Sequence, residues 1–459
     1  MSHIVRLALG WTLFASVVAI TACVWLFQTR AEAQNTQGQN AVCTSQTLCS
    51  GSTVGTRAFI DASMFLNPGQ QGNDLCDTIN GILGSRFGVT YPPHGAVIDA
   101  RGISTNLTCT LGTPWAEGSS YVNQPSTILL PAGTITTSVP WALPTNTRLI
   151  GIATGPGNNN LLDTTLQASS GFTSTAIVQF GDSHCPSSGC QGISIEHLTI
   201  NGIGQVVNGI ENDNCGLLCY VDHVNMYQVL GTGLKVSGTN ATDSGPYTDI
   251  TFDVGSSTGS STQCAQIINT NGTRGIHGMT CIANPDATNG ILLDASNNSI
   301  EDVRIIGFYN GIVVGSNATA KSNLLLNIYG DTLKSGLQPI NLIQIYSGSV
   351  SDLAIMAVSN AGGTGTTTIQ DLQTSTTLTD PYVAMYALGE SSSGGNSRFT
   401  TSTSAAANNA TWMFGSGAPP QTGCVMGSLY SDASSNSTGL YVCNPNGSGS
   451  YAWASVPVN

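Results

Sequence analysis

The sequence predicts an all-β protein whose middle winds as a parallel β-helix, with a capping helix before it and a small β module after it. Charged residues make up only 8% of the 459 residues, while glycine contributes 54, so the charged faces that long amphipathic helices need are missing. Apolar residues make up 40%, enough for a large core. A short phrase also recurs about every 26 residues, a period typical of stacked repeat units.

The charge balance excludes a nucleic-acid partner. The chain carries 12 Lys and Arg against 25 Asp and Glu, a formal net charge of −13 at pH 7. Binding to phosphate backbones depends on clustered basic side chains that release counterions, and the sequence has no such supply. The acidity would also repel a polyanion unless cations intervene, so it favours a neutral or cation-bridged partner.

Residues 1–33 have the layout of an export signal. A basic start precedes an apolar stretch from Leu7 to Phe27, and Ala31-Glu32-Ala33 has the small-x-small form that signal peptidase cleaves. This predicts a mature chain that begins at Gln34 with an N-terminal extension over 34–72. The protein would be secreted or displayed at the cell surface, with no membrane partner after signal removal. Because the apolar stretch is long enough to span a bilayer, an uncleaved N-terminal anchor is the alternative.

The cysteines predict disulfides rather than a metal site. Thirteen are present, and removing Cys23 of the signal leaves an even number in a chain exported to an oxidising compartment. Cys215 and Cys219 have no second pair at zinc-site spacing, so we predict no metal centre. Spacing cannot decide connectivity, but pairing in sequence order would staple neighbouring turns of a repeat protein: Cys43/Cys49, Cys76/Cys109, Cys185/Cys190, Cys215/Cys219, Cys264/Cys281 and Cys424/Cys443.

The capping helix is predicted over 74–87. Asn73 or Asp74 can cap its start, and residues 96–100 then alternate as the first strand. An open β-helix exposes strand edges at its ends, and natural solenoids cover them. The apolar face of this helix is formed by Leu75, Ile79, Ile82 and Leu83.

Seven related phrases define the β-helix, predicted with its capping helix over 73–385. Six of the seven have an apolar anchor after a two-residue polar interruption, with another apolar residue three before the anchor. Alternation after the anchor indicates a strand, and the interruption indicates a bend between two short strands. The anchors are Leu198, Val224, Ile250, Met279, Val303, Leu325 and Leu353.

A second phrase follows several of these bends about ten residues later. Asn-Gly at 208–209, 289–290 and 310–311 can supply a corner with positive φ before the next strand. Each repeat therefore forms one turn of a coil with about three short strands. Each strand pairs with its counterpart in the neighbouring turn.

These repeats, together with STILLPAGTITTSVPWALPTNTRLIGI at 126–152, resemble the pectate-lyase-like superfamily, in particular exported bacterial proteins related to rhamnogalacturonase and epimerase-type domains. The resemblance covers about residues 55–385. It implies a right-handed, single-stranded parallel β-helix and an extracellular polysaccharide as partner. It does not extend to the catalytic motifs of polygalacturonases, because His277 lies in Ile-His-Gly and no Arg-x-Lys occurs.

The composition changes beyond residue 385. Residues 386–415 are rich in Ser, Gly, Ala and Asn, which predicts a flexible linker. Over 416–459, two alternating segments flank a Ser/Asn loop, and Cys424 and Cys443 are placed to join them. We predict a small C-terminal β module there.

Candidate reactive side chains gather at the bends before the anchors. Because turns stack about 4.8 Å apart, equivalent bend residues form a column. Two carboxylates at this separation repel each other, which raises the pKa of at least one of them, whereas a neighbouring imidazolium lowers that pKa. An acid/base pair can therefore arise in such a column. We predict Asp222 and Asp249 as the catalytic carboxyl pair, supported by Glu196, His197 and His223.

A structural role for the same residues is the alternative, because polar side chains at solenoid bends commonly hydrogen-bond the corner backbone. Tyr227, just beyond a strand, is the better candidate for stacking on a sugar ring. Arg304 is predicted to bind substrate, and it would act as a lyase base only if acids from neighbouring turns converge on it. A local ion pair with Glu301 or Asp302 is its alternative role.

The leading functional hypothesis is an exported polysaccharide-binding β-helix that acts as a glycoside hydrolase through carboxylate acid/base chemistry. The first alternative is a non-catalytic surface, adhesion or tailspike-like protein. The second is a polysaccharide lyase. No cofactor is expected, with Ca²⁺ considered only for the lyase, and association as a homotrimer is compatible with the fold.

Overall fold

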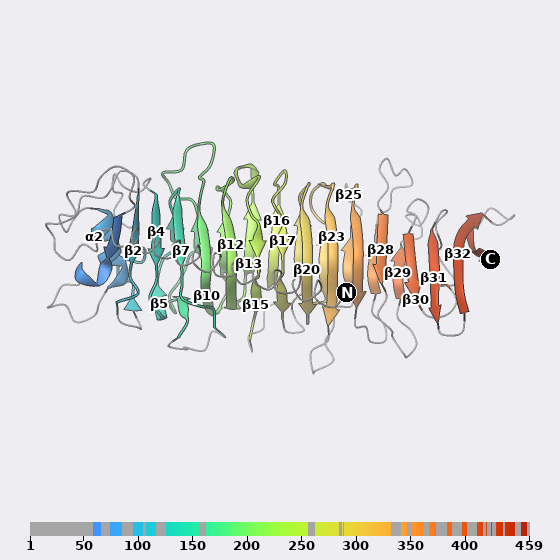
Figure 1. The fold of residues 1–459 in the computed structure, drawn as a ribbon, viewed down its shortest axis with the longest axis horizontal. Coiled ribbons are helices and arrows are strands. Elements are labelled where there is room, and N and C mark those ends of the chain that lie inside the picture. Colours follow the sequence, from blue (N-terminus) through green and yellow to red (C-terminus); the bar gives the residue numbers. More distant parts are fainter. Residues whose placement is uncertain are drawn as a thin grey trace, which may run out of the picture.

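The computed structural model describes residues 58–65, 74–84, 95–103, 107–115, 125–155, 162–255, 262–283, 287, 289–331, 341–346, 350–360, 367–372, 383–387, 397–401, 411–415, 419, 424, 428–434, 437–445 and 451–456. A row of short strands crosses the long axis, with the helix α2 (Leu75–Leu83) near one end and β32 (Ser437–Pro445) at the other (Figure 1). The predicted signal peptide, Cys43 and Cys49 lie outside these residues. Within the described ranges, no helix is long and apolar enough to cross a membrane.

A large sheet, parallel except for its last strands β32 and β33, runs along the molecule and forms one side of the coil. Its parallel pairings join each turn to the next from β1 to β31. Its strands are β1 (Ala58–Asp61), β2 (Ala96–Asp99), β3 (Leu107–Thr108), β4 (Ser126–Leu129), β5 (Gly133–Thr137), β7 (Thr147–Ile150), β8 (Thr164–Ala168), β10 (Ser194–Gln205), β12 (Tyr220–Val229), β14 (Tyr247–Thr248), β15 (Thr251–Asp253), β17 (Ile276–His277), β18 (Thr280–Ile282), β20 (Ser299–Ile306), β23 (Leu324–Asp331), β26 (Ala354–Asn360), β28 (Val383–Ala387), β30 (Thr411–Gly415), β31 (Leu429–Ser434), β32 and β33 (Tyr451–Val456).

A smaller parallel sheet forms another side of the same turns. Ten strands pair in chain order: β6 (Trp141–Leu143), β9 (Ala176–Phe180), β11 (Asn208–Asn212), β13 (Thr232–Ser237), β16 (Gln263–Ile268), β19 (Asn289–Asp294), β21 (Asn310–Val314), β24 (Asn341–Ile345), β27 (Thr367–Asp371) and β29 (Ser397–Thr401). The short pair β22 (Ala320–Lys321) and β25 (Val350–Ser351), and the 3-10 turns η2 (Ala62–Phe65) and η3 (Thr239–Ala241), complete the described elements.

The core is a set of apolar columns inside the coil. The inward-facing partners in successive turns of the larger sheet are buried, because each strand repeats the in-and-out alternation of the one before. The fold is the predicted right-handed, single-stranded parallel β-helix. One such column consists of Leu149, Ile195, Val221, Tyr247, Ile276, Ile300, Leu325 and Ile355.

That column corrects the predicted alignment of the last two repeats. Leu325 pairs with Ile300, three residues before the anchor Val303, and the true partner of Val303 is Ile328. In the next turn Val358 pairs with Ile328, so Leu353 is no anchor either. The apolar run at 324–326 offered two registers three residues apart, and only the stacking of whole turns distinguishes them.

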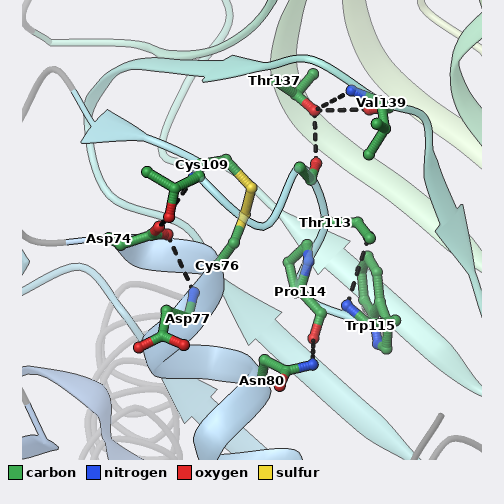
Figure 2. Close-up of a disulfide and its surroundings, with 12 residues drawn as sticks. Asp74, Cys76, Asp77, Asn80, Cys109, Thr113, Pro114, Trp115, Thr137 and Val139 are labelled. Carbon is green, nitrogen blue, oxygen red and sulfur yellow. Dashed lines mark hydrogen bonds between the residues drawn. A yellow bond between two sulfur atoms is a disulfide. The ribbon is translucent and has the colours of Figure 1, made fainter. Parts of the chain in front are cut away.

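The N-terminal cap is confirmed, with one correction to the strands around it. Asp74 caps α2 by accepting a hydrogen bond from the Asp77 amide at 3.1 Å. The predicted first strand, β2, is preceded by β1 within the segment assigned to the extension, and the two pair in parallel. Figure 2 shows the disulfide from Cys76 on α2 to Cys109, which ties the cap to the chain after β3.

The described disulfides follow the predicted order. Cys76–Cys109, Cys185–Cys190, Cys215–Cys219, Cys264–Cys281 and Cys424–Cys443 are all formed. Each joins cysteines that are consecutive in the sequence, so the bonds reinforce local contacts within the coil.

At the C-terminal end, strands stand where the composition suggests a linker. β28 pairs with β26 and β30, and β29 pairs with β27, so both parallel sheets continue through 386–415. Alternation of small and apolar residues is sufficient for a strand even when Ser, Gly and Asn dominate the segment. The β module then begins at β31, which pairs in parallel with β30 and antiparallel with β32.

Candidate functional site

The bend in each turn of the larger sheet decides which residue types can occupy it. The residue just before the anchor has a positive φ, a left-handed conformation that Asp, Asn and His tolerate better than other non-glycine residues. The φ angle is 54° at His197, 51° at His223, 50° at Asp249 and 55° at Asp302. The positive φ at the bends is therefore sufficient to explain why Asp and His recur in this column, with or without a catalytic role.

Three bend side chains from two neighbouring turns contact one another, and we call them the Asp–His–Asp array: Asp222, His223 and Asp249. His223 Nδ1 lies 3.0 Å from Asp222 Oδ1, and His223 Nε2 lies 3.4 Å from Asp249 Oδ2. These side chains are 30%, 50% and 58% exposed, respectively. The imidazole therefore bridges the two predicted carboxylates at a surface that a ligand can reach.

The array separates its charges by environment. Burial alone would raise the pKa of Asp222, but hydrogen bonds donated by Thr248 Oγ1 and by His223 outweigh it and hold that pKa below its ordinary value. The hydrogen bond to Asp222 raises the pKa of His223, and the charge of Asp249 adds to the effect. Asp222 is thus held as the anion, and His223 is biased toward the imidazolium form.

His197 lies one turn before His223 and completes the cluster. The two imidazole rings have centroids 4.9 Å apart and are tilted by 36°. One ligand atom each from His197, Asp222 and His223 lies within 4.8 Å of the other two, so these are the side chains at this site that could hold a metal ion.

Glu196 is close to the array but is engaged elsewhere. It pairs with Asp222 across the strands β10 and β12. Its Oε1 accepts hydrogen bonds from Ser194 and Tyr220, both at 2.8 Å, and Arg148 Nη2 lies 2.8 Å away. Burial opposes ionisation, but these donors outweigh it and lower the pKa of Glu196. With 8% of the residue exposed, Glu196 is a buried ion-pair partner that cannot meet a substrate directly.

A pocket of about 400 Å³ lies beside this ion pair. Arg148 and Tyr220 line it together with Ser194, and Ser126 and Leu218 complete one wall. Since Glu196 and Asp222 are opposite each other in the sheet, the pocket and the array lie on adjoining parts of one outer surface.

The two predicted substrate-binding residues lie apart from the pocket. Tyr227 is half-buried and packs against Gly255, whose Cα faces the tyrosine ring closely. Arg304 lies several turns further along the coil, and its Nε donates to Asp331 Oδ2 at 3.1 Å. Its partner is therefore Asp331 rather than Glu301 or Asp302, and no convergence of acids from neighbouring turns around Arg304 is seen in the described residues.

The remaining polar bend residues form local contacts. His277 Nδ1 lies 3.5 Å from Glu301 Oε2, and His277 Nε2 contacts the Arg274 carbonyl oxygen at 2.9 Å. Asn327 donates to Asp302 Oδ1 at 2.6 Å. These contacts agree with the alternative that bend residues have a structural role. Of the predicted reactive residues, only those of the Asp–His–Asp array and its neighbours lie together.

Two residues of the site, Arg148 and Thr248, could not be predicted from the repeat pattern. Arg148 reaches Glu196 across 48 residues, since the intervening turn is enlarged between β7 and β8. Thr248 stands where other turns have an acid or a histidine, and its hydroxyl supports Asp222. Once the register is known, Thr248 aligns with Glu196, Asp222 and His277 in successive turns, and this alignment identifies it as a member of the site.

Comparison with known proteins gives likeness of fold. No protein-family model and no curated protein matches the sequence. Among solved structures, the tailspike protein of E. coli bacteriophage HK620 in complex with a hexasaccharide is similar with a TM-score of 0.46, 12% identity, and coverage of 81% of this chain and 70% of that one. The mannuronan C-5 epimerase A-module of Azotobacter vinelandii has a TM-score of 0.38, 12% identity, and coverage of 75% and 97%. A polygalacturonase from Erwinia carotovora has a TM-score of 0.36, 12% identity, and coverage of 73% and 98%.

The parallel ladders, the buried columns and the helical cap place the chain among the right-handed parallel β-helix proteins. The likeness to the solved structures, at 12% identity, is one of fold alone. A shared fold does not assign a reaction, so the activity has to be argued from the site.

Proposed function

We propose that this protein is an exported β-helix that binds an extracellular polysaccharide and cleaves it as a glycoside hydrolase. The observation that carries the proposal is the exposed Asp–His–Asp array, in which an imidazole lies within 3.4 Å of carboxylates from two successive turns. The adjoining pocket at Arg148 and Tyr220 offers room for part of the chain to be cleaved. The solved structures of polysaccharide-handling proteins named above make a glycan the natural ligand class to test.

The geometry suggests a role for each member of the array. Asp222 keeps His223 protonated, and the imidazolium gives its proton to the departing sugar oxygen as the glycosidic C–O bond breaks. Asp249, the most exposed of the three, takes a proton from the water whose oxygen bonds to the sugar carbon. Proton exchange with solvent restores both groups. His197 and Glu196 position the array, His197 through ring contact and Glu196 through the strand pairing with Asp222.

The test is a screen of the purified protein on neutral and acidic polysaccharides, with reducing ends and ultraviolet absorbance of unsaturated products measured together. Asp222→Asn and Asp249→Asn should each lower hydrolysis by about 100-fold or more, since each removes a group that moves or holds a proton. Asp302→Asn is the matched control, because it changes an acid of the same bend column outside the array.

Each outcome of the screen selects one function. Unsaturated products that depend on added Ca²⁺ would replace the hydrolase by the lyase. Retention of polysaccharide with no cleavage of any kind would favour the surface, adhesion or tailspike-like alternative. Light scattering on the same sample tests the proposed homotrimer, and N-terminal sequencing of exported protein tests cleavage before Gln34.

A further inference from the structure

A second cleft lies on the smaller sheet, away from the Asp–His–Asp array. Its volume is about 780 Å³, and it lies over the outer face of β6 and β9. Ala142 and Gln179 form its floor, since they alternate with the buried Trp141, Val178 and Phe180. None of its lining residues takes part in the site described above.

One wall of the cleft is an aromatic ring held by the N-terminal cap. Trp115 meets the edge of the buried Trp141, with ring centroids 6.0 Å apart and planes at 83°. Asn80 on α2 donates to the Pro114 carbonyl oxygen at 3.0 Å, beside the Cys76–Cys109 disulfide, and Figure 2 shows Trp115 next to Pro114 in this strap. The ring is therefore fixed before any ligand arrives.

The polar residues that line the cleft are also held by hydrogen bonds. Asp182 accepts the His184 amide at 3.0 Å through Oδ1, and its Oδ2 lies 2.8 Å from His184 Nδ1. Asn214 accepts a hydrogen bond from Asn240 at 2.9 Å. The Cys185–Cys190 disulfide closes the loop that directly follows the Asp182–His184 pair. Asp213 adds a carboxyl group between these residues.

The charges around the cleft discriminate against anions. Asp182 and Asp213 line it, and His184, its one basic lining residue, is already paired with Asp182. Partial desolvation raises the pKa of Asp213, and repulsion from Glu211 adds to this. Lys235 on the neighbouring strand is held by Glu211 at 2.6 Å. An incoming carboxylate or sulfate would meet no available cation among the described lining residues.

We propose that this cleft is a second binding site that takes a neutral oligosaccharide segment, separate from the site of cleavage. A rigid indole offers an apolar face to the C–H side of a pyranose ring. The amide, carboxyl and imidazole groups of Gln179, Asp182, His184 and Asp213 offer donors and acceptors for the hydroxyl groups. Binding here would hold a polysaccharide on the coil whether or not the array cleaves it.

The proposal is tested by affinity electrophoresis of the full-length mature protein in native gels that contain dextran, laminarin, xylan or polygalacturonate. The wild type should be retarded by at least one of the neutral polymers and not by polygalacturonate through this cleft. Trp115→Ala and Asp213→Asn should each weaken the retarding interaction by about tenfold, the effect of losing one stacking or charged hydrogen-bonding group. Tyr309→Ala removes an aromatic ring that is 50% exposed elsewhere on the coil and should change nothing.

The remaining variants keep the test decisive if Trp115→Ala fails to fold. Trp115→Phe keeps an aromatic face and should retain most of the retardation, and Asp213→Asn conserves volume. Retardation by neutral polymers that is unchanged in both Trp115→Ala and Asp213→Asn, or its absence in the wild type, overturns the proposal. Asp222→Asn should leave retardation intact, so a failure of the cleavage hypothesis and a failure of this one give different results.

Discussion

His223 shows how one residue can satisfy the backbone and prepare chemistry together. Its φ of 51° suits the bend, and the same bend directs its ring between Asp222 and Asp249. Neither demand conflicts with the other, because an imidazole tolerates the left-handed region and gains two anionic partners there. A bend residue of this kind can therefore be structural in one turn and reactive in the next.

The raised pKa of His223 predicts a pH-dependent stability. Because the folded pKa is above the ordinary value of 6.5, the ion pairs with Asp222 and Asp249 stabilise the fold fully below that value, and this contribution is lost as pH rises through the folded pKa. His223→Gln should lower Tm relative to wild type at pH 5.5, and the difference should shrink toward pH 9. Half of the side chain is exposed, so the effect is small, and a difference that grows with pH would contradict this assignment.

The contribution of Glu196 to stability should have the opposite pH dependence and be larger than that of His223. Its pKa is lowered from the ordinary 4.5, so its contribution is present above that value and is lost as pH falls through the folded pKa. Glu196→Gln should cost about 1–3 kcal/mol of unfolding free energy at pH 7, because the carboxylate accepts hydrogen bonds from Ser194 and Tyr220 as well as from Arg148, and the residue is 8% exposed. Denaturant titration measures this.

Asp99→Asn is the control for that measurement. Asp99 forms an ion pair with Arg101, whose side chain is 51% exposed, so breaking it should cost under about 1 kcal/mol. Equal losses in the two variants would show that Glu196 is no more than a surface ion pair.

At the scale of elements, side-chain ladders reinforce the smaller sheet. Asn310 donates to Asn289 Oδ1 at 2.9 Å, and Asn341 donates to Asn310 Oδ1 at 2.9 Å, so one amide links three successive turns through β19, β21 and β24. All three stand at the start of their strands, where the chain leaves a corner. Such a ladder holds register because a slip of one residue would break every bond in it.

Asn310→Ala should therefore destabilise the protein by about 1–3 kcal/mol, since it removes two hydrogen bonds at a site that is 7% exposed. Chemical denaturation measures the loss. Asn271→Ala offers the comparison, because Asn271 is an exposed residue with one side-chain bond, from Asn297 at 3.2 Å, and its loss should lie within about 0.5 kcal/mol. If Asn310→Ala loses less unfolding free energy than Asn271→Ala, the asparagine ladder does not stabilise the protein.

For the whole molecule, the ends of the coil are the vulnerable places. α2 lies close to the first turns of the coil (Figure 1), where Leu75, Ile79 and Ile82 are fully buried. A parallel β-helix without such a cover presents unpaired strand edges and apolar side chains to other copies. The cap covers the apolar side chains of the end turn, as a neighbouring turn covers those of an inner turn.

Ile79→Asp is expected to displace this cap, because a carboxylate would be buried among apolar side chains, and to cost more than about 3 kcal/mol. Light scattering should then show a mass that rises with protein concentration as exposed ends associate. Met64→Asp places the same charge nearby on a residue that is 45% exposed and should leave the mass unchanged. A monodisperse, wild-type mass for Ile79→Asp would show that the helix is not needed to block end-to-end association.

The sequence by itself determined the coil, because a repeat of apolar residues with period two inside a period of about 26 can be buried on one side only if successive turns stack. It also identified the bend residues of the first five repeats, where a positive φ favours Gly, Asp, Asn and His. Tertiary structure alone decided which of them meet. Arg148 contacts Glu196 across 48 residues, Ile328 rather than Leu325 occupies the anchor position, and Trp115 and Asp213 line one cleft. The lengths of the connections between strands set these contacts, and those lengths leave no periodic trace in the sequence.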